Sequence, residues 1–192
     1  MRLLAQCVST LALIGAVLAT ATTAAAEECL TRPDELRSAV AAKDALRWAR
    51  AEAEKTDPDS ALTRMMTTGA VDAEGRSTGW MLELSSAKRL HVVYFDKGAM
   101  MCTTHTLEAP LMVTPVTVSA DTILDLARLI KIAREALTPS PDRKLKVSAG
   151  IQQNADDSAP RWSISFVDEK GYPKGQVTID AMTGAVVGKT PP

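Results

Sequence analysis

The spacing of apolar residues predicts two amphipathic helices, one in each half of the chain. The first runs roughly from Pro33 to Lys55, and the second from about Ala120 to Leu137. Apolar residues in both segments recur at steps of three and four, which is the period of one helix face. Thr31 can cap the start of the first segment, and Ser119 precedes the second. The two stripes are Ala42, Ala45, Leu46, Ala49 and Ala53, and Ile123, Leu126, Ala127, Ile130, Ala133 and Leu137.

Alternation of apolar and polar residues predicts strands after each helix. Trp80, Leu82 and Leu84 share one face of the first predicted strand, 80–84. The others are expected at 90–95, 99–105, 144–148, 162–166, 176–180 and 185–187. Glycine-containing turns at 96–98, 168–171 and 180–184 separate neighbouring strands. Short turns of this kind join antiparallel strands, so each half should form a meander.

The order of a helix followed by strands occurs twice, which predicts an α+β fold. We expect tandem repeats of a helix plus an antiparallel meander, each sheet covered on one face by one helix. Trp80 and Trp162 begin equivalent strands 82 residues apart. The expected boundaries are a first αβ unit at 27–109, an extended linker at 110–118 and a second unit at 119–192. Chance similarity between two αβ segments remains the alternative explanation of the repeat.

Residues 1–26 have the three parts of a secretory signal peptide. Arg2 supplies a positive charge, residues 11–19 form an apolar core, and Ala24-Ala25-Ala26 matches a cleavage site. An N-terminal membrane anchor is the alternative, although no charge-free run of about 20 strongly apolar residues supports it. Cys7 precedes the apolar core, whereas a lipid-attachment cysteine would follow it. We therefore expect a periplasmic or secreted protein with no integral membrane segment after cleavage.

Cleavage after residue 26 would leave two of the three cysteines. Cys29 and Cys102 are then the available intramolecular pair in an oxidising compartment. A disulfide closing this long span contributes up to roughly 4 kcal/mol in the chain-entropy model. A structural bond is the first interpretation and a redox-active pair the second, because a Cys-x-x-Cys spacing is absent.

The charge of the chain argues against nucleic acid as a partner. The 192 residues contain 22 Lys+Arg and 23 Asp+Glu, for a formal net charge of −1. Nucleic-acid-binding domains usually carry a strongly basic face. With 46% hydrophobic and 23% charged residues, the composition is that of a folded protein.

The last strands of the second half resemble the C-terminal part of a PepSY domain. The similar stretch has the pattern Trp162-x-Ile-x-Phe-x-Asp168-x-x-Gly171, followed by Val177-x-Ile-Asp180-Ala-x-Thr183-Gly184-Ala-Val-Val. Asp180 can accept hydrogen bonds from backbone N–H groups of the turn, and Gly184 can adopt a positive φ. The first half would then be a divergent copy of this domain. It retains Trp80 and the turn at Asp96 and Gly98.

This resemblance implies an extracytoplasmic, non-enzymatic domain. PepSY domains occur in protease propeptides and in secreted or membrane-bound proteins, and they are associated with inhibiting or modulating partner proteins. The resemblance transfers no catalytic residues. A tandem αβ inhibitor of β-lactamases has a similar repeat plan and mature length, which is a likeness of architecture.

Candidate residues for catalysis or metal binding are few. His91 and His105 are the histidines, and Cys102-x-x-His105 is by itself a weak zinc pattern. The acidic pairs at 156–157 and 168–169 are expected to lie in solvated turns, with calcium binding as the alternative. The methionine pairs at 65–66 and 100–101 are expected to fill the core, with a binding surface as the alternative.

These observations predict an exported, non-enzymatic binding module. We expect it to engage or modulate another envelope or secreted protein, with inhibition of an enzyme as one form of that role. No catalytic, metal or cofactor site is assigned, and no cofactor is expected. The alternative is a periplasmic protein that binds a small ligand or a metal.

Overall fold

The structure is a computed structural model, and it describes residues 27–29 and 36–191. It contains two helices, α1 (Ala42–Ala53) and α2 (Leu126–Ala136). The strands of the first half are β1 (Glu27–Glu28), β2 (Val40–Ala41), β3 (Ala61–Thr67), β4 (Arg76–Ser77), β5 (Gly79–Ser85), β6 (Arg89–Asp96) and β7 (Ala99–Thr106). Those of the second half are β8 (Lys146–Gln152), β9 (Arg161–Val167), β10 (Pro173–Asp180) and β11 (Val186–Thr190). The α+β class is confirmed.

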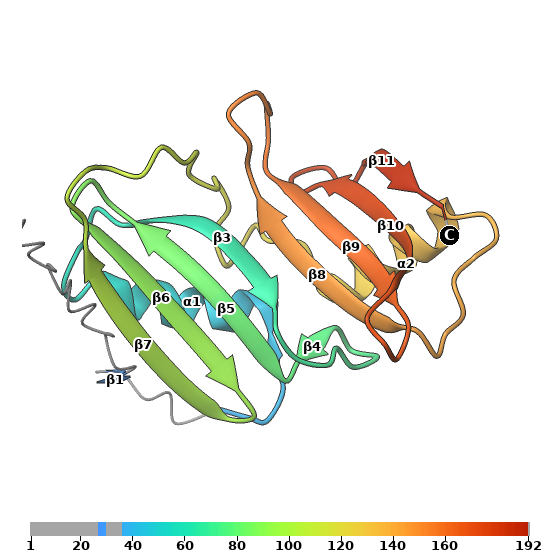
Figure 1. Ribbon diagram of the computed structural model, residues 1–192, viewed down its shortest axis with the longest axis horizontal. Coiled ribbons are helices and arrows are strands. Elements are labelled where there is room, and N and C mark those ends of the chain that lie inside the picture. The colour runs from blue at the N-terminus through green and yellow to red at the C-terminus, as the bar shows by residue number, and fades with distance from the viewer. Residues whose placement is uncertain (1–26, 30–35, 192) are drawn as a thin grey trace, which may run out of the picture.

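One continuous antiparallel sheet of nine strands runs through the described residues. Its order is β1-β7-β6-β5-β3-β8-β9-β10-β11, and β2 and β4 form a separate two-stranded ladder. We expected a separate sheet in each half, and that expectation was wrong. β3 pairs with β8 at Arg64–Gln152, Met65–Ile151 and Met66–Gly150, and this seam joins the strands of the two halves. Both helices lie behind the sheet in the view of Figure 1, so they cover the same side of it.

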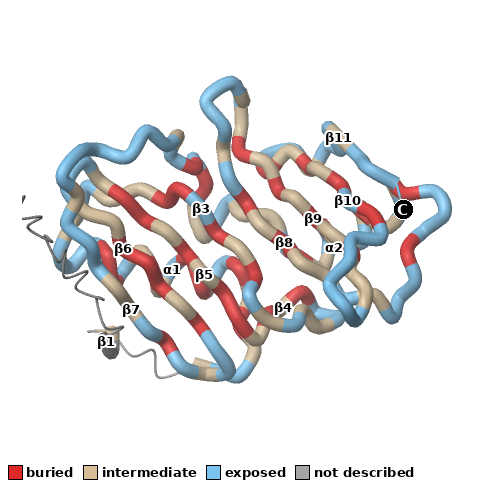
Figure 2. Tube along the Cα trace, in the orientation of Figure 1, coloured by how far each residue is buried: buried red, intermediate tan, exposed pale blue. Residues whose placement is uncertain are grey.

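The core lies between the sheet and the two helices. The strand residues that face the helices are buried, and they include Trp80, Phe95, Trp162 and Phe166 (Figure 2). α1 contacts β5 and β6, whereas α2 contacts β9, β10 and β11. The Trp80 Nε1–H donates to the Val40 carbonyl at 2.8 Å, which ties β5 to the residues before α1. All these buried apolar residues belong to one cluster that continues across the seam.

Both helices begin later than the sequence predicts. α1 starts at Ala42 because Val40 and Ala41 are extended and pair with β4. The expected cap Thr31 lies outside the described residues, and Ala41 at the N-cap makes no side-chain bond to the helix. α2 starts at Leu126, where the Asp125 side chain accepts from the Arg128 N–H.

Ser119, which precedes the predicted second helix, forms a turn of its own ahead of α2. Its backbone N–H donates to the Thr122 hydroxyl at 2.9 Å. The Ile123 N–H in turn donates to the Ser119 carbonyl at 2.9 Å. This closed turn satisfies the local backbone groups, so the helix begins after it.

β3 is a strand that the sequence pattern does not predict. A bulge between Leu62 and Arg64 leaves both Leu62 and Thr63 buried, which interrupts the alternation. The expected strands around β5, β6, β7, β9 and β10 match the structure within a few residues. β8 and β11 extend further along the chain than expected, to Gln152 and Thr190.

None of the helices among residues 27–29 and 36–191 has the length and apolar character needed to span a membrane. The predicted signal peptide, including Cys7, lies outside these residues.

Candidate functional site

The side of the sheet opposite the helices carries a row of apolar side chains. Directly paired residues in an antiparallel sheet point to the same face. The register pairs Met66 with Met81, Met81 with Tyr94, and Tyr94 with Met101. Met101 is 38% exposed and the other three are half-buried. We call this surface, with its continuation through Gly150 and Ser163 and with Arg64 at its centre, the open face.

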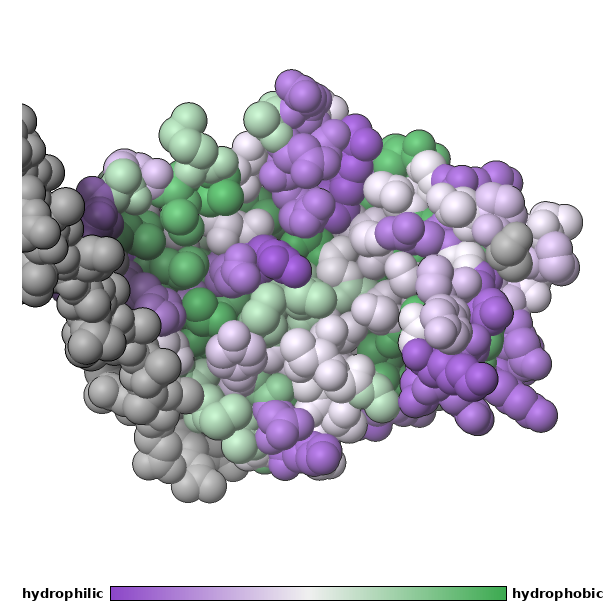
Figure 3. Space-filling view, viewed as in Figure 1, coloured by the Kyte–Doolittle hydropathy of each residue, from purple (hydrophilic) through white to green (hydrophobic). Residues whose placement is uncertain are grey.

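The open face changes character at the seam. Met66 is paired with Gly150, and Gly150 is paired with Ser163, so bulky side chains give way to small ones. Figure 3 shows apolar atoms gathered over the strands of the first half and a paler, weakly polar surface over β8 and β9. The open face therefore has an apolar half with bulky side chains beside a weakly polar half with small side chains.

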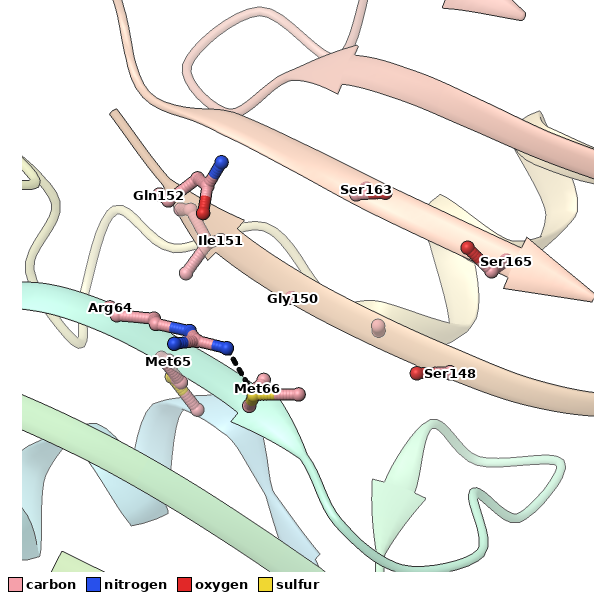
Figure 4. Close-up of a pocket in the computed structure, with 10 residues that line it drawn as sticks. Arg64, Met65, Met66, Ser148, Gly150, Ile151, Gln152, Ser163 and Ser165 are labelled. Atoms are coloured by element: carbon pink, nitrogen blue, oxygen red, sulfur yellow. Dashed lines mark hydrogen bonds between the residues drawn. The ribbon is translucent and has the colours of Figure 1, made fainter. Parts of the chain in front are cut away.

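A shallow hollow lies on the seam, where Gly150 has no side chain. It has a volume of about 250 Å³ and is lined by Ser148, Ser163 and Ser165 as well as Gly150. Figure 4 shows the serines on β8 and β9 and Arg64 on the opposite side of the hollow. A side chain from a partner could fill this space without displacing a covering layer.

Arg64 is the cation at the centre of the open face. Its Nη1 lies 3.7 Å from Glu83 Oε1, and its Nη2 donates to Met66 Sδ at 3.2 Å. The Arg64 side chain is 46% exposed, so the ion pair contributes little to stability. Its guanidinium remains available for bidentate contact with a carboxylate or a carbonyl.

An exposed apolar loop borders the open face. Met112 is 99% exposed and Val113 is 49% exposed, and both line a recess of about 370 Å³ beside Arg64. This loop lies between Pro110 and Pro115, which limit its backbone conformations. It is anchored where the Val116 N–H donates to the Leu62 carbonyl at 2.7 Å.

His91 lies behind the open face, on the helix side. It is 5% exposed; its Nδ1 is 3.0 Å from Thr104 Oγ1, and its Nε2 is 3.8 Å from Asp57 Oδ2. Burial lowers the pKa of His91, although Asp57 acts to raise it. The Ser86 hydroxyl donates to Asp57 Oδ2 at 2.5 Å and not to the imidazole. This serine, aspartate and histidine therefore lack the nucleophile–base hydrogen bond that activates a serine.

The Cys102-x-x-His105 pattern does not form a metal-binding pair. Alternation along β7 puts Cys102 and His105 on opposite sides of the sheet. Cys102 is bonded to Cys29 across a sequence separation of 73 residues. Glu52 lies close to both sulfur atoms, but disulfide sulfurs are not thiolate ligands.

The turn predicted around Asp180 is held by that carboxylate. Asp180 Oδ1 accepts from the Thr183 N–H at 2.8 Å, the Thr183 hydroxyl at 2.9 Å and the Met182 N–H at 2.9 Å. The N–H and hydroxyl of Thr183 lower the pKa of Asp180 by stabilising the charged form. Gly184 follows with φ of +76°. These residues shape a surface turn between β10 and β11, away from the open face.

The corresponding turn between β6 and β7 is built differently. Lys97 and Gly98 both have positive φ, at 46° and 90°, as a two-residue hairpin turn requires. Asp96 precedes them and is paired with Ala99. The Lys97 N–H donates to the Thr78 carbonyl at 2.8 Å.

Each predicted methionine pair is divided between the core and the open face. Met65 is fully buried and Met100 is 7% exposed, while their neighbours Met66 and Met101 lie on the open face. The prediction of core filling therefore holds for Met65 and Met100. The alternative, a surface position, holds for Met66 and Met101.

Sequence reasoning missed other residues of the open face, namely Met81, Tyr94, Gly150 and the loop at Met112. The available signal was the apolar character of Met81 and Tyr94 at strand positions between core residues. For the loop, the signal was three apolar residues enclosed by two prolines.

Comparisons with known proteins bear on the fold. No protein-family model matches the chain, and no curated protein matches it. The structure is similar to the crystal structure of "a putative lipoprotein" from Clostridium difficile 630, with a TM-score of 0.56 and 12% sequence identity. The similarity covers 85% of this chain and 99% of that one. At this identity the likeness concerns the fold alone, and the PepSY resemblance stays a prediction.

Proposed function

We propose that the protein is an exported, non-enzymatic module that binds another envelope or secreted protein through its open face. The observation that carries this proposal is the cross-strand row of Met66, Met81, Tyr94 and Met101, which no helix of the described residues covers. Tyrosine, methionine and arginine are enriched at protein interfaces. Arg64 and Tyr94 together provide the kinds of side chain on which binding energy concentrates.

The geometry of the face suits a protein partner better than a small molecule. The hollow at Gly150 is shallow, with a volume of about 250 Å³, below the usual size of a ligand pocket. A broad surface with one hollow and an exposed loop at its rim instead matches a partner that contributes several side chains. Methionine side chains adapt to such surfaces because they are unbranched and flexible.

Export is supported by three observations. The first 26 residues have the pattern of a signal peptide. The Cys29–Cys102 disulfide is typical of proteins in oxidising compartments. The similar structure from Clostridium difficile is described as "a putative lipoprotein", and lipoproteins are an exported class. Periplasmic and secreted locations are both compatible with these observations.

A duplication would account for the element order. α1 is followed by β3, β5, β6 and β7, and α2 is followed by β8, β9, β10 and β11. Each helix covers the meander of its own half, and the two meanders meet at their first strands. We therefore infer that two PepSY-like units underlie the fold, with the first as the more divergent copy.

The non-enzymatic part of the proposal rests on the arrangement of the polar groups. On the open face, Ser148, Ser163 and Ser165 lie together without a histidine beside them in the hollow. The buried His91 contacts a threonine and lies near a carboxylate. Modulation of a partner, including inhibition of an enzyme, then requires the partner's active site to be blocked or reshaped by docking.

Site-specific photo-crosslinking in intact cells of the source organism tests the proposal. A photoreactive amino acid replaces Met81 on the open face or, as the control, Lys43 on the exposed side of α1. We expect one saturable protein adduct from position 81 and none from position 43. Tyr94→Ala should reduce the adduct at least tenfold, whereas Lys43→Ala should not change it. Equal adducts at both positions, or none at position 81, would refute the proposal.

A further inference from the structure

A second surface with the properties of a ligand site lies on the helix side of the sheet. The groove is formed by α2, the segment before β4 and the segment leading into β8, and its volume is about 830 Å³. We call it the α2 groove. This volume is within the range of small-molecule sites. Figure 1 shows the segment around β4 extending from the first half beside β8, so residues from both halves contribute to the groove.

The floor of the α2 groove is apolar and incompletely buried. Val71, Ile130, Leu145 and Val147 pack against the core but keep part of their surface accessible. Ala127 lies beside them on α2. Covering this surface with an apolar chain would be favourable, because it removes apolar area from water.

Arg134 is held in the wall of this groove by an aromatic ring and two backbone carbonyls. Its guanidinium lies 4.7 Å from the centre of the Phe166 ring. Its Nη1 donates to the Pro141 carbonyl at 2.8 Å and to the Asp142 carbonyl at 3.1 Å. Burial lowers the pKa of Arg134, and the positive charge of Arg143 acts in the same direction. The side chain is thus fixed in position while its charge is still available to an anion.

The charges around the groove leave a net positive charge, because Arg134 and Arg143 lie near a single further carboxylate, that of Asp142, which acts to raise the pKa of Arg134. Lys131 is paired with Glu135, with Nζ and Oε1 4.0 Å apart. Asp72 is paired with Arg76 at 2.8 Å. Within the described part of the chain, neither Arg134 nor Arg143 takes part in an ion pair. Guanidinium groups bind carboxylates in a bidentate geometry.

From these observations we propose that the α2 groove binds a fatty acid, with the carboxylate at Arg134 and Arg143 and the alkyl chain over Ala127, Ile130 and Leu145. The two parts of such a ligand match the two parts of the groove, a cationic wall and an apolar floor. The site lies on the side of the sheet away from the open face, so it does not depend on the protein-binding proposal.

Calorimetric titration of the purified full-length protein with laurate, below its critical micelle concentration, tests this site. We expect saturable one-to-one binding of laurate. Acetate, which lacks the chain, and dodecanol, which lacks the charge, should bind at least tenfold more weakly. If dodecyl phosphate or an acidic peptide saturates the site and laurate does not, the proposed carboxylate lipid is wrong.

Matched variants locate the site. Arg143 is exposed, so Arg143→Gln should leave the fold intact and weaken laurate binding about tenfold. Lys146→Gln removes one positive charge from the other side of the sheet, because Lys146 alternates with the groove residue Val147 along β8, and it should change affinity less than twofold. Ile130→Asp, whose folding is checked by circular dichroism, should abolish binding through the floor. Unchanged laurate affinity in both Arg143→Gln and Ile130→Asp would overturn the assignment, and crosslinking from position 81 should be unaffected by either.

Discussion

His91 is deeply buried, and burial makes its protonation costly in the folded state, although a carboxylate nearby reduces that cost. The imidazole is 5% exposed, and Asp57 Oδ2 is 3.8 Å from its Nε2. Burial lowers its pKa below the ordinary value of 6.5; Asp57 and Glu52 oppose this effect, while Arg89 adds to it. A histidine whose pKa is lower in the folded than in the unfolded protein favours unfolding once the unfolded chain takes up the proton.

We therefore expect the free energy of unfolding to fall as the pH decreases below about 6.5. The slope from this one residue is at most about 1.4 kcal/mol per pH unit. His91→Asn keeps a polar side chain beside Thr104 but does not titrate, so its stability should fall less over pH 6.5 to 5. Urea unfolding followed by circular dichroism measures the effect. His105→Asn, on the exposed end of β7, is the control and should keep the wild-type profile; parallel profiles for His91→Asn and wild type would contradict the expectation.

Residue positions were predictable where strand alternation alone decides them. Cys102 and His105 are three residues apart, so a strand must place them on opposite sides of the sheet. The same rule separates Met65 from Met66. The partner of Arg134 was not predictable, because the Phe166 ring and the Pro141 carbonyl reach it through tertiary packing.

At the scale of elements, the segment around β4 connects the two halves by close packing. Gly75 has φ of +73°, and a Cβ built on it would lie 2.4 Å from the backbone nitrogen of Ala127 in α2. A positive φ strains other residues, and backbone atoms of α2 leave no room for a side chain. Ala127 also lines the α2 groove.

Gly75→Ala should therefore destabilise the protein more than a positive φ alone explains. Gly171 is the matched control, with φ of +85° and no heavy atom within 4 Å of a built Cβ. Gly171→Ala should cost about 1 kcal/mol, the strain of a left-handed alanine. Gly75→Ala should exceed it by at least about 2 kcal/mol, as expected for overpacking against a fixed backbone. Denaturant unfolding of both variants measures the difference in the free energy of unfolding. Equal losses would contradict the expectation, because they would mean that α2 shifts to admit the Cβ at little cost.

The helix boundaries show why element ends were less predictable than element types. Apolar periodicity identified both helices, but the start of α1 depends on Val40 and Ala41 pairing with β4, which is a contact across the chain. β3 was missed because its bulge places Leu62 and Thr63 together in the interior. In both cases a tertiary contact overrides the local pattern.

At the scale of the whole molecule, the seam between β3 and β8 makes one sheet out of two meanders. Three residue pairs form it, and the Thr67 side chain extends it. The Ala149 N–H donates to the Thr67 hydroxyl at 2.9 Å, and that hydroxyl donates to the Ala149 carbonyl at 3.2 Å. The buried core continues through this junction. The sequence predicted both meanders but not their union, since β3, one of the two strands that form the seam, was not recognised.

A continuous sheet and core should unfold in a single cooperative transition. Thr67→Val removes both bonds to Ala149 and leaves buried backbone groups unpaired, which should cost about 1–3 kcal/mol. Thr63→Val is the control on the same strand, because the Thr63 hydroxyl donates to the Glu83 carbonyl of β5, within the first half. In scanning calorimetry, we expect one transition for each variant. The midpoint temperature should be lower for Thr67→Val than for Thr63→Val. Two resolved transitions in the wild-type protein would mean that the halves fold independently and that the seam is a contact between domains.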